Sequence, residues 1–171
     1  INPKHPKTKM KKITLIIAML FATIVSAQNF EEKLCEGKVT YFKKANGEIR
    51  YIAFIDNIAF IVGTTVGSDK MNYYASLKYT GGDTPMVKKK GAKIIMENGE
   101  VINKPDVEIK IEVNKKAQYE YKAFVPLTED EIKILLDNKT SKIQLYVMES
   151  NVVNPEEVQS VFSCIYNHAT K

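Results

Sequence analysis

Hydrophobic and polar residues alternate along much of the chain, in short runs that are separated by turn signals. In the clearest run, apolar side chains from Val107 to Val113 occupy every second position, with mostly charged side chains between them. Such alternation is typical of a β-strand with one buried face. Further alternating or continuous apolar runs predict strands at 39–44, 48–55, 58–62, 71–79, 92–96, 119–125 and 143–147. The chain is therefore expected to be mainly β.

Two Asn-Gly pairs predict tight β-hairpins. Asn46-Gly47 and Asn98-Gly99 each lie between apolar-rich segments, and the second hairpin returns at 101–102. An Asn-Gly pair between apolar-rich runs is the strongest short-range signal of a hairpin. The run 51–55, resumed at 58–62, is apolar on both faces. We expect it to form central strands that are buried on both sides.

Two helices are expected, both near the C-terminus. Thr128 followed by Glu131 is a capping-box pattern, which predicts a short helix to about Asp137. A second helix is expected to begin at Asn154-Pro155, because Asn caps helices and Pro suits the first turn. Its apolar residues recur on one face: Val158, Val161, Phe162 and Ile165. We expect a mainly β single domain, an antiparallel β-sandwich or curved sheet, with one short helix and the C-terminal helix packed on it; α+β is the alternative.

The segment 10–27 predicts an export signal. It begins with Met10, Lys11 and Lys12, continues as an apolar run, and ends at Ala27, the small residue that a signal peptidase requires. A membrane span competes with this interpretation, but a span needs about 20 apolar residues and this run is shorter. We expect residues 1–9 to be a spurious upstream extension, 10–27 a cleaved signal peptide, and 28–171 a single β-rich domain, periplasmic or extracellular, without a membrane span.

The formal charge changes once the signal is removed. The whole sequence has 25 basic and 20 acidic residues, a net charge of +5. All of the acidic residues but only 20 of the basic ones follow Ala27. The expected mature chain is therefore neutral overall, and it lacks the basic excess that neutralises phosphates. We expect no nucleic-acid partner.

The two cysteines, Cys35 and Cys164, lie near the two ends of the expected domain. An oxidising compartment favours a disulfide between them, and two unpaired buried thiols are the alternative. Cys164 and His168 have the i, i+4 spacing of half a metal site, but no second Cys/His cluster in the sequence completes it. We expect a disulfide, no metal and no cofactor.

No motif predicts catalysis. His168 is the single histidine after the expected cut, and the glycine-containing segment 63–67 lacks the Lys-Ser/Thr of a phosphate loop. Carboxylates alone can hydrolyse glycosidic bonds. However, Glu108 and Glu112 flank Lys110 on one strand face, a pattern that suits a soluble edge. We expect no catalytic residues; a small carboxylate-dependent hydrolase acting on glycans or envelope material is the alternative.

Three aromatic residues are candidates for a binding surface. Tyr74, Phe124 and Tyr146 fall on strand faces opposite the apolar stripes. The alternative is that helices or a second sheet cover both faces. With export, near-zero charge and no catalytic motif, this pattern predicts a non-catalytic binding or structural module whose ligand is a protein, a peptide or a glycan.

The organisation of the chain resembles that of small exported proteins of unknown function from Gram-negative bacteria. The resemblance rests on a short signal ending Ser26-Ala27-Gln28, a β-rich body, the strand-to-helix step at 125–131, and a terminal helix that carries Cys164. It implies export and a β-rich single domain. It transfers no functional residue.

Overall fold

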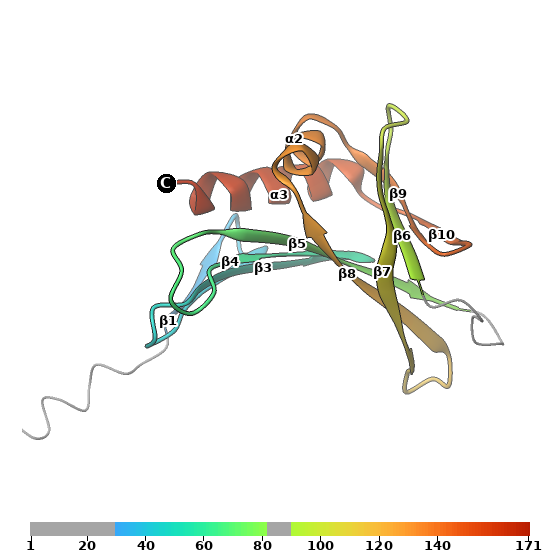
Figure 1. The fold of residues 1–171 in the computed structure, drawn as a ribbon, viewed down its shortest axis with the longest axis horizontal. Coiled ribbons are helices and arrows are strands. Elements are labelled where there is room, and N and C mark those ends of the chain that lie inside the picture. Colours follow the sequence, from blue (N-terminus) through green and yellow to red (C-terminus); the bar gives the residue numbers. More distant parts are fainter. Residues whose placement is uncertain (1–29, 82–89) are drawn as a thin grey trace, which may run out of the picture.

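The computed structural model of the chain describes residues 30–81 and 90–171, which form ten strands and two helices (Figure 1). The expected export signal lies outside these residues. The strands are β1 (Phe30–Leu34), β2 (Val39–Lys43), β3 (Ile49–Ile55), β4 (Ile58–Gly63), β5 (Asn72–Thr80), β6 (Lys90–Met96), β7 (Val101–Val113), β8 (Tyr119–Leu127), β9 (Thr140–Leu145) and β10 (Met148–Asn151). The helices are α2 (Glu129–Asp137) and α3 (Pro155–Ala169).

The strands form one open antiparallel sheet in the order β1-β2-β3-β4-β5-β8-β7-β6-β9-β10. The expected mainly β fold is confirmed as a curved sheet with two helices, which realises one of the two arrangements that we expected. The curvature brings the β3–β4 turn close to β10. There the Asn57 side-chain amide donates hydrogen bonds to Ser150 Oγ (2.9 Å) and to the Asn151 carbonyl (3.1 Å).

Strand β7 joins the two parts of the sheet. Its first part pairs with β6, as at Ile102↔Ile94, and its last part pairs with β8, as at Ile111↔Tyr121. Pro105 lies inside β7, within the stretch where the pairing with β6 is irregular, and a proline without an N–H is tolerated there. In Figure 1, β6 and β7 run steeply across the direction of β3, β4 and β5.

Both helices begin as the sequence predicts. The Thr128 side chain accepts from the Glu131 amide, and Glu131 Oε2 accepts from the Thr128 amide at 2.8 Å, so the capping box is complete. At the start of α3, the Asn154 side chain accepts from the Glu157 amide at 3.3 Å. These local hydrogen bonds satisfy amides that the first helical turn leaves without partners.

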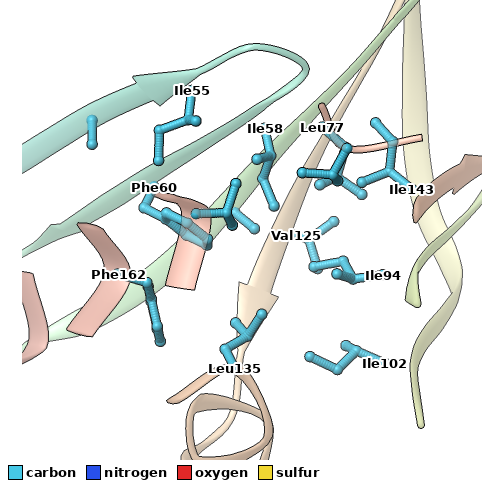
Figure 2. Packing of buried hydrophobic residues seen from close by; sticks show 14 of the residues in the cluster. Ile55, Ile58, Phe60, Leu77, Ile94, Ile102, Val125, Leu135, Ile143 and Phe162 are labelled. Carbon is cyan, nitrogen blue, oxygen red and sulfur yellow. The ribbon is translucent and has the colours of Figure 1, made fainter. Parts of the chain in front are cut away.

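The core lies between α3, α2 and the sheet face that they cover (Figure 2). Phe162 of α3 and Phe60 of β4 are both fully buried, with their ring centroids 4.5 Å apart. The four apolar residues expected on one face of α3 are all buried, namely Val158, Val161, Phe162 and Ile165. Helix α3 therefore packs on the sheet as expected.

The two outermost strands and one turn differ from the expectation. Strands β1 and β10 were not expected, because their short sequences, FEEKL and MESN, are rich in polar residues. Charged, short edge strands are a common way to prevent pairing with other molecules. The strand expected at 143–147 ends at Leu145, and Tyr146 adopts a positive φ of 56° in the turn to β10.

Candidate functional site: the outer face of the sheet

The side chains of β3, β4, β5 and β8 divide between two faces of the sheet. Phe60 points toward α3, and its cross-strand neighbours Ala53 and Ala75 share that covered face. The alternate residues therefore point to the opposite side, which we call the outer face. Two cross-strand rows form its centre: Ile52–Ile61–Tyr74 and Phe54–Ala59–Ser76–Phe124.

Aromatic side chains dominate this centre. Tyr74 and Phe124 stack with ring centroids 4.6 Å apart and an interplanar angle of 19°. Phe124 is 50 % exposed and Phe54 is 80 % exposed. Phe54 and Phe124 are therefore large exposed apolar side chains at the two ends of one cross-strand row, and they are candidates for contact with another molecule.

The expected burial on both sides is wrong for 51–55, whereas 58–62 is largely buried, with only Ile61 half-buried. Tyr51, Ala53 and Ile55 are buried, but Phe54 is largely exposed and Ile52 is half-buried. The helices cover one side of β3 only, so its second apolar stripe meets solvent. Phe54 is the residue that the sequence analysis missed, although polar neighbours on the same face, such as Ser76, indicate that this side is solvated.

A hollow of about 310 Å³ borders one end of the aromatic centre. Lys78 and Lys122 line it beside Phe54. Lys78 and Lys122 are directly opposite each other on β5 and β8, and Lys110 of β7 continues the row. Like charges opposite each other destabilise a sheet unless they are neutralised, so this row requires acidic neighbours.

Glu112 and Glu120 neutralise Lys122, the middle lysine of the row. Lys122 Nζ lies 2.7 Å from Glu112 Oε2 and 3.1 Å from Glu120 Oε2. The hydrogen bond from Lys122 lowers the pKa of Glu120, and the bonds to Glu112 and then Glu120 raise the pKa of Lys122. A glycosidase requires one carboxyl group with a raised pKa to act as the acid. Glu120 is shifted in the opposite direction.

A second hollow, of about 400 Å³, borders the other end of the aromatic centre beside Phe42 and Ile52. Its polar lining includes Lys44 and Arg50, which both pair with Glu48, a side chain that is only 6 % exposed. The Lys44 hydrogen bond, at 2.8 Å, is the largest cause that lowers the pKa of Glu48, and Arg50 adds to it. This end of the face therefore also carries charges of both signs.

Of the three aromatic candidates, the structure brings two together. Tyr74 and Phe124 share the outer face, whereas Tyr146 lies in the β9–β10 turn, where its amide donates to the Gly91 carbonyl at 2.8 Å. Tyr146 is 37 % exposed and lines a different hollow, beside Pro105. The candidate surface is therefore centred on Phe54, Tyr74 and Phe124.

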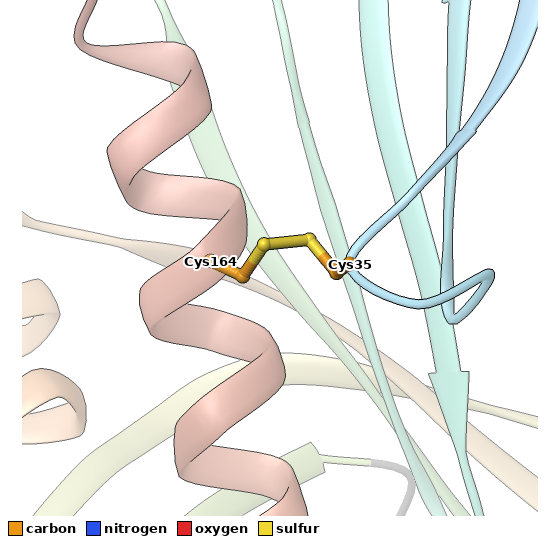
Figure 3. The surroundings of a disulfide bond; sticks show 2 residues. All are labelled: Cys35 and Cys164. Carbon is orange, nitrogen blue, oxygen red and sulfur yellow. A yellow bond between two sulfur atoms is a disulfide. The ribbon is translucent and has the colours of Figure 1, made fainter.

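Cys35 and Cys164 form a disulfide, with their Cα atoms 6.2 Å apart (Figure 3). The expected pairing is thus present, and it joins the β1–β2 turn to α3. His168, one helical turn after Cys164, completes a group in which the two sulfurs and an imidazole nitrogen lie within 4.8 Å of one another. In the sequence, Cys164 and His168 alone have the spacing of metal ligands. The fold places the Cys35 sulfur beside them as a third potential ligand. While the sulfurs are bonded to each other, they offer no thiolate to a metal.

The fold and the outer face define a mainly β single-sheet protein with an exposed aromatic surface. Neither α2 nor α3 has the length and apolar character needed to cross a lipid bilayer, and no other helix is found in the described residues. Comparison of the chain with known protein families, with curated proteins and with solved structures finds no significant match.

Proposed function

We propose that this chain is an exported, non-catalytic binding module that binds a protein partner through the outer face of its sheet. One observation carries the proposal: Phe54 and Phe124, from different strands, are 80 % and 50 % exposed on a face that the helices leave uncovered. Leaving large aromatic groups in water is unfavourable, and contact with a partner removes that cost.

The distribution of charge favours a protein as the partner. Protein interfaces have an apolar, aromatic centre surrounded by a polar rim, with few charges at the centre. Here the centre is apolar, and the two bordering hollows carry both cations and carboxylates, such as Lys78 with Glu120 and Arg50 with Glu31. A rim of mixed sign suits the mixed charges of another protein surface better than a polyanion, and it can fix the orientation of the complex.

Export is supported by the signal-like segment 10–27 and by the disulfide, because disulfides persist in oxidising compartments. The rival hypothesis, a carboxylate-dependent hydrolase, has Glu112 and Glu120 as its best acid pair. The lowered pKa of Glu120 and the ion pairs of both carboxylates with Lys122 favour a structural role over that of a catalytic acid.

Site-specific cross-linking tests the proposal. The photoreactive amino acid p-benzoylphenylalanine replaces Phe54 in the full chain, expressed in the cell that makes it. The matched control places it at Val153, which is equally exposed at 80 % but lies just before α3. We expect a cross-linked protein from position 54 and none from position 153. The captured protein is then purified and titrated with the wild-type chain and with the Phe54→Ser/Phe124→Ser variant.

The titration decides the outcome. We expect the double variant to bind the purified partner at least about tenfold more weakly, because the few residues that dominate binding cluster near the centre of an interface and cost about 2 kcal/mol or more when truncated. The same products from both positions, or equal affinity of wild type and variant, would overturn the proposal. A cross-linked product with twice the mass of the chain would show that the partner is a second copy of this chain. If the wild-type chain hydrolyses glycans and the Glu120→Gln variant does not, the hydrolase hypothesis would be favoured instead.

A further inference from the structure

The disulfide lies beside a third metal-binding side chain. Cys164 and His168 are one turn apart on α3 and so share a face of the helix, and Cys35 approaches them from the β1–β2 turn. The three donor atoms lie within 4.8 Å of one another. In a tetrahedral site with Zn–S bonds of about 2.3 Å and Zn–N bonds of about 2.0 Å, the donors are separated by roughly 3 to 4 Å. Small side-chain movements would bring the three groups to that spacing.

Contacts other than the disulfide keep the three residues together. Val39 is fully buried and pairs with Leu34, which fixes the turn that carries Cys35. Lys38, in the same turn, pairs with Glu157 of α3 at 2.8 Å. At the far end of α3, the Tyr51 hydroxyl donates to the His168 carbonyl at 3.3 Å. The ion pair between Lys38 and Glu157 thus links the turn to α3 independently of the disulfide, and the Tyr51 hydrogen bond holds the end of α3 on the sheet.

We propose that Cys35, Cys164 and His168 form a redox-gated metal site, closed by the disulfide and open to Zn²⁺ when the disulfide is reduced. A dithiol reductant supplies two electrons and two protons: the Sγ–Sγ bond breaks, two S–H bonds form, and the reductant becomes a disulfide. Zn²⁺ then displaces both thiol protons and forms two Zn–S bonds and one bond to the neutral imidazole. Water takes the fourth position.

The chemistry of the three groups suits zinc. Two thiolates and one imidazole, with a fourth position left to water, are one of the ligand sets that zinc takes in proteins. Two thiolates also neutralise the dication, so the half-buried site gains no net charge. His168 is exposed, which gives the metal a path from solvent.

Cobalt titration of the full chain tests the site. The protein is reduced with a dithiol and desalted without oxygen, then titrated with Co²⁺, which reports thiolate ligation through a charge-transfer absorption. We expect one Co²⁺ per chain, displaced by one Zn²⁺, and no such absorption in the oxidised protein. His168→Ala should bind at least about tenfold more weakly, and Asn167→Ala, an exposed neighbour on the same helix, should bind like wild type. Zn²⁺ should raise the melting temperature of the reduced wild-type chain more than that of reduced His168→Ala.

Three results would overturn the site. The first is equal affinity of wild type and His168→Ala, since the cysteines alone would then explain binding. The second is equal metal binding by oxidised and reduced protein. The third is unchanged affinity in denaturing urea, which would show that the fold does not bring the ligands together.

Discussion

The rings of Phe60 and Phe162 lie 4.5 Å apart, tilted by 45°, and this contact attaches the C-terminal helix to the centre of the sheet. Phe60 belongs to β4 and Phe162 to α3, and neither side chain has exposed surface. Because α3 is an amphipathic helix, most of its stability in the protein comes from such packing. The Phe60–Phe162 contact therefore lies on the covered face of the sheet. The outer face is the opposite side, on which neither α2 nor α3 packs.

Replacing Phe162 with alanine should destabilise the protein by about 3 to 5 kcal/mol, because it removes a buried ring and leaves a cavity against Phe60. The urea midpoint of unfolding measures this loss. Val153→Ala is the control: the side chain is 80 % exposed, and its removal should cost less than about 0.5 kcal/mol. Equal midpoints for the two variants would contradict the packing of α3 on β4.

Breaking the disulfide should lower the free energy of unfolding by about 2 to 5 kcal/mol under non-reducing conditions, because the bond restricts the unfolded chain. Cys35→Ser, Cys164→Ser and the double variant should all show a similar loss, since each removes the same bond. Thermal unfolding of the three variants measures it. A free-thiol assay that finds two thiols in the denatured wild-type protein would contradict the pairing.

The Glu48 cluster should make stability depend on acid pH. Its ion pairs with Lys44 and Arg50 lower the pKa of Glu48 in the folded state below the ordinary value of 4.5. The pairs therefore stabilise the fold above that value, and the contribution is lost as the pH falls through the lowered pKa. Glu48→Gln should be less stable than wild type at neutral pH and should lose less stability on acidification.

Chemical unfolding from neutral to acid pH measures this difference. Asp130→Asn is the control, because the Asp130 side chain is 91 % exposed and its ion pair with Lys133 lies on the surface of α2. The control should follow the wild-type curve. Parallel curves for wild type and Glu48→Gln would show that Glu48 does not contribute to the acid response.

Glu36→Gly is expected to stabilise the protein. Cys35 and Glu36 have φ angles of 53° and 58°, and the Gly37 amide donates to the Leu34 carbonyl at 3.0 Å, which is a turn with both central residues left-handed. Such turns favour glycine, and a glycine at position 36 should add about 0.5 to 1 kcal/mol after its larger loss of chain entropy. Melting temperature measures the gain.

Glu32→Gly provides the contrast, because Glu32 lies in the extended strand β1, where glycine weakens a strand. We expect the two glycine substitutions to change stability in opposite directions. A loss of stability in Glu36→Gly would show that the left-handed turn does not strain the chain.

Features that depend on neighbours in sequence were predicted well. Thr128 with Glu131, and Asn154 with Glu157, form the caps that the sequence indicates, because both partners lie within one helical turn. The hairpins at Asn46-Gly47 and Asn98-Gly99 are present as well, because each turn closes within a few residues, with Gly47 and Gly99 at positive φ angles of 85° and 88°.

The exposure of the outer face depends on which elements cover the sheet. Phe54 belongs to an apolar run whose two faces look alike in sequence, and α3, which covers only one of them, begins at Pro155. The proximity of Cys35 and His168 also depends on tertiary packing, because it requires the β1–β2 turn to lie beside α3. The short edge strands β1 and β10 carry too few apolar residues to produce an alternating pattern.

The bond between Cys35 and Cys164 spans a sequence separation of 129 residues, so it makes most of the domain a covalent ring. A protease that cuts one exposed turn inside that ring, such as the turn around Lys116 between β7 and β8, leaves both fragments attached to each other. Nicked molecules would keep their full mass until the disulfide is reduced. A first cleavage in such a turn thus leaves the domain as one covalent unit.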